Sequence, residues 1–121
     1  MKVVKMGELP EEPATSALFT GGLVNRQTPF GPDDSKTFNM GVVSFSAGSR
    51  NKFHTHTSDQ LLIVTEGTGV VATDDAEATV TVGDVILIPA GESHWHGAPG
   101  ETPMAHISIQ GKGSTTTQIE Q

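Results

Sequence analysis

The sequence has no cysteine, few basic residues and no long apolar run. Without cysteine the chain cannot form a disulfide, a thiolate metal site or a cysteine nucleophile, so any metal must be bound through nitrogen and oxygen. Seven Lys and Arg against 14 Asp and Glu give a net charge of −7, which argues against nucleic acid and anionic lipid as partners. No segment reaches the roughly 18 apolar residues of a membrane helix, and no apolar run follows the first lysines. We therefore expect no signal peptide, no membrane partner and a cytoplasmic location.

Helix is also nearly absent from the sequence pattern. The 121 residues, 35% of them hydrophobic, suit one domain spanning 1–121 with a core at about 15–110. Fourteen glycines and seven prolines divide the chain into short segments, which is typical of an all-β barrel or sandwich. We expect a bent early strand around Gly21-Gly22, a loop at 28–35 and a frayed, flexible tail at 111–121. Further strands are predicted at 38–46, 53–56, 60–66, 69–73, 78–82, 85–88, 94–96 and 104–110.

All five histidines lie in the second half of the chain, and four of them form two His-x-His pairs. These are His54-Thr55-His56 and His94-Trp95-His96, with His106 further on. Because side chains alternate along a strand, both histidines of a pair point to one face. In a barrel that face can be the lumen, where three nitrogens and one oxygen suffice for a divalent transition metal. A polar, exposed strand face is the alternative interpretation of each pair taken alone.

The spacing around these pairs resembles the two motifs of the cupin family. The sequence contains Gly48-x5-His54-x-His56-x3-Gln60-x6-Gly67 and Gly83-x5-Pro89-x-Gly91-x2-His94-x3-Ala98. The family patterns are G-x5-H-x-H-x3,4-E-x6-G and G-x5-P-x-G-x2-H-x3-N, so Gln60 replaces the usual Glu and Ala98 the usual Asn. The resemblance implies a single-domain cupin, a double-stranded β-helix or jelly-roll barrel. It also implies a metal bound by His54, His56, Gln60 and His94.

Gln60 changes the expected chemistry of such a site. Three imidazoles and an amide leave a divalent ion with its full charge of +2, whereas a glutamate would reduce the local charge to +1. We expect a stronger Lewis acid and weaker metal binding, since an amide donates less than a carboxylate. The alternative is that Gln60 is an ordinary strand residue beside an empty site.

Two further histidines are candidates for proton transfer. His96 shares a strand face with His94, and His106 shares one with Met104, Ser108 and Gln110. We expect both in the lumen, as general base and acid near neutral pH; the alternative is that one of them only orients a ligand by hydrogen bonding. Trp95 faces away from His94, toward the core or an interface. We expect a substrate pocket lined by Phe38, Met40, Val42, Leu62, Val64 and Gln110.

Within the cupins, the sequence is most similar to the small bacterial manganese-dependent hydroxynitrile lyases. The similar segments are His54-Thr55-His56, Gln60, 62–65, 91–97 and 106–110. This resemblance implies reversible cleavage of a cyanohydrin to an aldehyde or ketone and cyanide. The substrate hydroxyl would bind the metal and pass its proton to His106 or His96. Mn²⁺ is the metal it favours, with Fe²⁺, Zn²⁺ or Ni²⁺ as alternatives.

Three other functions stay open at this point. One is a cupin that converts unsaturated uronates, which would need Arg or Lys to bind the substrate carboxylate. The sequence offers only Arg26, Arg50 and Lys52 for that role, and this scarcity argues against it. Iron-dependent dioxygenase chemistry and a non-catalytic metal or small-molecule binding domain are the other two. We also expect a homodimer or homotetramer, since Leu61, Ile63, Ala105, Ile107 and Ile109 would otherwise form an apolar outer patch.

Overall fold

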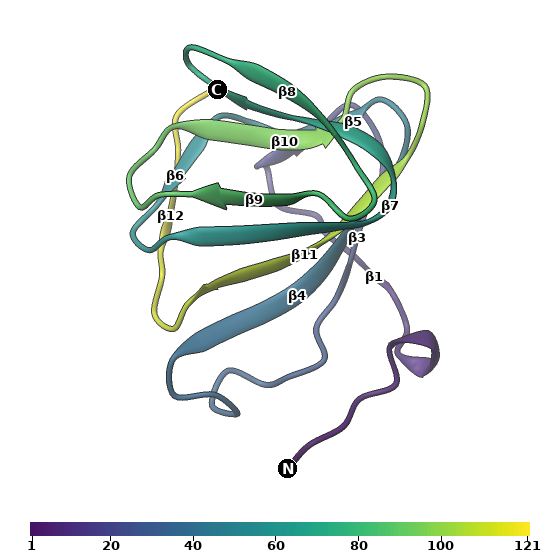
Figure 1. The fold of residues 1–121 in the computed structure, drawn as a ribbon, viewed down its shortest axis with the longest axis vertical. Coiled ribbons are helices and arrows are strands. Elements are labelled where there is room, and N and C mark those ends of the chain that lie inside the picture. Colours follow the sequence, from purple (N-terminus) through teal and green to yellow (C-terminus); the bar gives the residue numbers. More distant parts are fainter.

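The computed structural model describes all residues, 1–121, as an antiparallel β-sheet that curls into a half-barrel (Figure 1). The only helix is a 3₁₀ turn, η1 (Met6–Glu8), and no helix is long and apolar enough to span a bilayer. The predicted all-β class is confirmed. The strands are β1 (Glu12–Pro13), β2 (Phe19–Thr20), β3 (Val24–Gln27), β4 (Phe38–Phe45), β5 (Ser49–Asn51), β6 (His54–His56), β7 (Gln60–Thr73), β8 (Glu77–Thr81), β9 (Val85–Ile88), β10 (His94–Ala98), β11 (Met104–Gly111) and β12 (Thr116–Gln118).

The long strand β7 joins the two layers of the half-barrel. Its first half pairs with β11 and β9, and its second half pairs with β10 and β8 (Figure 1). The bend lies at Gly67, where φ is +69° and an added Cβ would lie 1.9 Å from the carbonyl oxygen of Pro103. Only glycine fits there, because the conformation is left-handed and a neighbouring backbone fills the space. The two strands predicted at 60–66 and 69–73 are thus one continuous strand.

The core and the lumen share one face of the central strands. Leu62 and Val64 on β7 are buried, and the register places His106 of β11 between Val64 of β7 and Val43 of β4. The other face carries the half-buried Leu61, Ile63, Ile107 and Ile109, as predicted for the outer patch. Ala105, also predicted to contribute to that patch, is buried.

The C-terminal segment contains a further strand, where the sequence predicted only a frayed tail. Strand β12 pairs with β6 along its whole length, with Thr116 opposite His56. Beyond it, the Glu120 carboxylate accepts two hydrogen bonds from Arg50, at 3.0 and 2.8 Å, and a third from the backbone N–H of Phe53. The segment has little apolar surface, so backbone pairing and this ion pair hold it in place.

Candidate metal centre

Three histidines from two adjacent strands meet at one point of the lumen. His54 and His56 lie on β6, and His94 lies opposite His54 on the neighbouring β10. One nitrogen from each ring lies within 4.8 Å of the other two, and all three residues are buried. The two His-x-His pairs therefore converge as their shared strand faces predicted.

The other nitrogen of each ring faces an oxygen atom. Nδ1 lies 2.6 Å from the carbonyl oxygen of Lys52 for His54, and 2.9 Å from that of Glu92 for His94. For His56, Nδ1 lies 2.9 Å from Oγ1 of Thr116. A neutral imidazole that donates its Nδ1–H to these acceptors keeps the lone pair on Nε2. Hydrogen bonding of this kind fixes the tautomer in which Nε2 binds a metal.

Gln60 supplies a fourth donor atom beside the rings. Its amide nitrogen donates to Oγ of Ser108 at 3.0 Å, and its Oε1 lies 3.0 Å from Nε2 of His94. When His94 donates from Nδ1, these two atoms turn lone pairs toward each other, an arrangement that a cation relieves. Nε2 of His56 is buried with no hydrogen-bond partner at all. Three ring nitrogens and one amide oxygen that face one another without donors fit a divalent transition metal.

Burial keeps all the lumen histidines neutral at pH 7. It lowers the pKa of His54, His56 and His106 to about 4, and it lowers the pKa of His94 and His96 as well. Neighbouring imidazoles add to the lowering at His54, His56 and His96, because two like charges cannot be accommodated side by side. Neutral rings are the form that ligates metals.

His96 and His106 form a second histidine pair beside the first cluster. Nε2 of His106 lies 2.9 Å from Nδ1 of His96. Asn51 holds His96: its Oδ1 accepts the backbone N–H at 2.8 Å, and its Nδ2 lies 3.2 Å from Nε2 of the ring. Nδ1 of His106 is buried without a partner. His106 is therefore the member of the pair with a nitrogen still free.

A cavity of about 90 Å³ adjoins both histidine clusters. It shares Arg26, Val43, Ser108 and Gln110 with a second cavity of about 200 Å³, so the two adjoin. Gln110 thus lines the cavity as predicted, and the buried Leu62 and Val64 belong to the core on the same face. The histidine cavity is lined by Leu18, Phe19, Arg26, Val43, Phe45, Asn51, His54, His56, Gln60, His96, His106, Ser108, Gln110 and Thr116.

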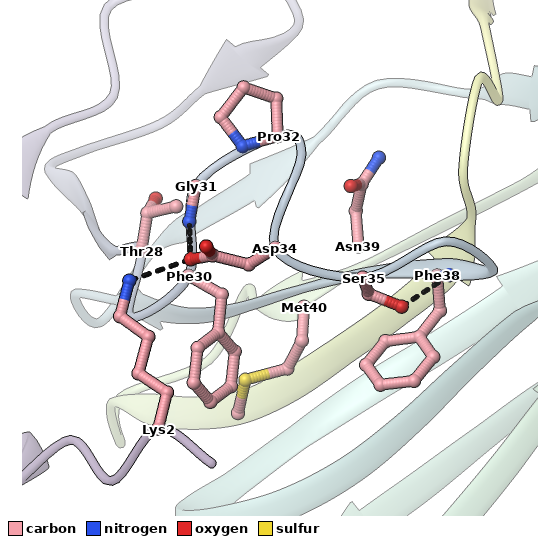
Figure 2. Close-up of a pocket in the computed structure, with 10 residues that line it drawn as sticks. All are labelled: Lys2, Thr28, Phe30, Gly31, Pro32, Asp34, Ser35, Phe38, Asn39 and Met40. Atoms are coloured by element: carbon pink, nitrogen blue, oxygen red, sulfur yellow. Dashed lines mark hydrogen bonds and ion pairs between the residues drawn. The ribbon is translucent and has the colours of Figure 1, made fainter.

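The remaining predicted pocket residues, Phe38, Met40 and Val42, do not line the histidine cavity itself. Phe38 and Met40 line a pocket of about 460 Å³ beside the loop between β3 and β4 (Figure 2), and Met40 also lines the cavity of about 200 Å³ that adjoins the histidine cavity. Val42 pairs with Ile107 on the outer face of the sheet. The prediction was wrong for Val42, because Val43 is the residue of β4 that pairs with His106 and faces the lumen.

Four polar residues that line the histidine cavity were not predicted as site residues: Arg26, Asn51, Ser108 and Thr116. Ser108 could have been found, because it shares a strand face with His106 and Gln110. Asn51 could not, since residues 52 and 53 interrupt the strand between it and His54 and break the alternation. Thr116 lies in a short polar strand that no local pattern distinguishes from a tail.

Known proteins resemble this chain in sequence or in fold. An (R)-mandelonitrile lyase from Granulicella tundricola is 34% identical over 111 residues, which cover 91% of this chain and 84% of that protein. An acireductone dioxygenase from Granulibacter bethesdensis is 43% identical over 61 residues, covering 45% of this chain and 34% of that protein. The crystal structure of a cupin-like protein from Thermotoga maritima superposes with a TM-score of 0.81 at 26% identity, covering 99% of this chain and 90% of that one.

A family model described as "Cupin domain" matches residues 41–110, which include every histidine and Gln60. The match spans both histidine pairs and the bend of β7. The geometry agrees with it, because the residues of the two cupin motifs meet in one lumen. The chain belongs to the cupin family.

Proposed function

We propose that the protein is a metal-dependent lyase that reversibly cleaves a cyanohydrin into an aldehyde or ketone and cyanide. The observation that carries this proposal is the pairing of two features in one lumen: a cluster of three imidazoles and an amide oxygen, and a neutral histidine pair beside it. The similarity to an (R)-mandelonitrile lyase over most of both chains supports the choice of reaction.

His54, His56, His94 and Gln60 would hold the metal, and we propose Mn²⁺, with Fe²⁺, Zn²⁺ or Ni²⁺ as alternatives. A divalent ion in this ligand set is a Lewis acid that lowers the pKa of a hydroxyl group. None of the four ligands is charged, so nothing in the ligand set offsets the charge of the ion. The nitrogen and oxygen donors exclude none of these metals, since all of them accept imidazole.

The histidine pair would move the proton. Nδ1 of His106 has no partner, and in the tautomer whose Nε2–H donates to Nδ1 of His96 it carries the lone pair to which we assign acceptance of the proton from the substrate hydroxyl. His96 stabilises the charged ring through the 2.9 Å contact at the other nitrogen, and Asn51 fixes His96 in place. As the carbonyl double bond forms, the carbon–carbon bond breaks and its electron pair leaves with cyanide. His106 then returns the proton to cyanide, so no redox partner is needed.

A second candidate is metal-dependent oxygen chemistry. The similarity to part of an acireductone dioxygenase covers less than half of this chain, and the same neutral donors accept Fe²⁺. Oxygen consumption separates the two candidates, because cyanohydrin cleavage consumes none.

The experiment is reconstitution of the metal-free protein separately with Mn²⁺, Fe²⁺ and Zn²⁺, followed by a mandelonitrile cleavage assay that measures benzaldehyde release. We expect metal-dependent release with at least one metal. His54→Ala and His94→Ala should lose the metal by elemental analysis, whereas His106→Ala should keep it and lose turnover. Release no faster than in buffer for every metal would exclude the lyase, and normal turnover in His106→Ala would exclude the assigned base.

A further inference from the structure

Arg26 is one of the residues that line the histidine cavity. It is an exposed residue on β3, and its side chain lines both the histidine cavity and the adjoining cavity of about 200 Å³. It is the only positively charged residue, lysine or arginine, that lines either of them. Arginine and lysine are scarce in the sequence, which argues against substrates with a carboxylate, but the structure places one of the two arginines beside the lumen.

The guanidinium of Arg26 has no partner within the chain. The other arginine, Arg50, is engaged by the carboxylate of Glu120 and lies over the ring of Trp95 at 4.8 Å. Arg26 takes part in no ion pair and no side-chain hydrogen bond. Glu12 is its cross-strand neighbour on β1, yet the two form no ion pair within 4 Å. All five donors of Arg26 are therefore available to a ligand.

We propose that Arg26 binds a carboxylate of the substrate, so that the lumen acts on hydroxy compounds that also carry an anionic group. Arginine presents a planar fork that matches a carboxylate with two hydrogen bonds. The chain has a net charge of −7, which repels anions in general. The unpaired cation of Arg26 beside the cavity favours binding of an anionic ligand over its neutral analogue.

The sizes of the cavities set the shape of such a substrate. About 90 Å³ beside the histidines accommodates only the reacting end, and the adjoining 200 Å³ next to Arg26 holds the remainder. The hydroxyl and the carboxylate are thus separated by a spacer. This deepens the proposed function by naming the substrate class, and it rests on that function only for the position of the hydroxyl at the metal site.

The test compares matched ligands that cannot react. Binding of benzyl alcohol and of 3- and 4-(hydroxymethyl)benzoate to the Mn²⁺-loaded protein is measured by calorimetry, at low and high salt. We expect one of the carboxylates to bind about fivefold more tightly than the alcohol, the size expected of an exposed but bidentate ion pair. Arg26→Gln should abolish this preference and leave alcohol binding unchanged, and Arg26→Lys should restore part of it. Lys36→Gln removes the same charge from an exposed residue that lines neither cavity, and should have no effect.

Several results would overturn the proposal. The first is an unchanged preference for the carboxylate in Arg26→Gln, which would mean that the carboxylate binds the metal itself. The second is equal affinity of the parent protein for the alcohol and the carboxylates. The third is no measurable binding of either carboxylate. Cyanohydrin turnover is scored separately. If mandelonitrile and its carboxylated analogues are all inert while Arg26 still determines the preference, the lyase proposal fails and the substrate class stands.

Discussion

Thr116→Val removes the hydroxyl oxygen that His56 faces without changing the size of the side chain. Oγ1 of Thr116 lies 2.9 Å from Nδ1 of His56, and His56 is only 6% exposed. In the variant, Nδ1–H loses its acceptor, so the ring is no longer held in the tautomer that leaves Nε2 free. The change lies outside the four ligands and should leave the fold intact, since β12 pairs with β6 through the backbone.

The expected loss is about 1.4 kcal/mol in metal binding, or about tenfold in Kd. A neutral hydrogen bond to a largely buried group contributes about 1 to 2 kcal/mol, and groups that orient a metal ligand typically affect affinity by 10- to 100-fold. We take the lower end because Thr116 is exposed, so that water can reach the abandoned N–H.

The assay is equilibrium dialysis of the metal-free protein against Mn²⁺, with bound metal measured by elemental analysis. Thr117→Val is the matched control, because Thr117 is the next residue of β12, is also exposed, and makes no side-chain hydrogen bond to a histidine. A Kd for Thr116→Val within twofold of the parent, or an equal loss in Thr117→Val, would refute the inference that this hydroxyl supports a metal ligand.

Three further predictions follow from the fold. Gly67→Ala should destabilise the protein by at least about 2 kcal/mol in urea unfolding, because it combines a left-handed φ with a clash against Pro103; Gly83→Ala, equally left-handed but with nothing within 4 Å, should cost about 1 kcal/mol. The free energy of unfolding of the metal-free protein should decrease as the pH falls from 6.5 to 4, because the histidines are protonated in the unfolded chain but stay neutral when buried in the fold. The decrease should be up to about 1.4 kcal/mol per pH unit for each ring whose pKa is lowered to about 4. Equal free energies of unfolding at pH 7 and pH 5 would contradict this. We propose that two copies pair through the outer face, where Leu87 is 65% exposed opposite Leu61, so light scattering should report a dimer or a larger assembly that Leu87→Glu dissociates; a monomeric parent protein would exclude it.

The ligand cluster could be predicted because it depends on local rules. Alternation along a strand places His54 with His56 and His94 with His96, and short turns rich in Gly, Asp and Pro require an antiparallel sheet. These rules act between residues a few positions apart, so the sequence carries them directly. Family spacing then singled out Gln60, which the structure places beside His94.

Tertiary structure alone decided which residues surround the ligands. On β4 the sequence cannot reveal whether odd or even residues face the lumen, since both sets contain apolar side chains, and pairing with β11 selects Val43 and excludes Val42. Thr116 and Arg26 reach the site from strands 60 and 28 residues away from His56 and His54, through backbone pairing that no local pattern encodes. These positions depend on the pairing of distant strands, which is why the roles of Thr116 and Arg26 could not be predicted from local patterns.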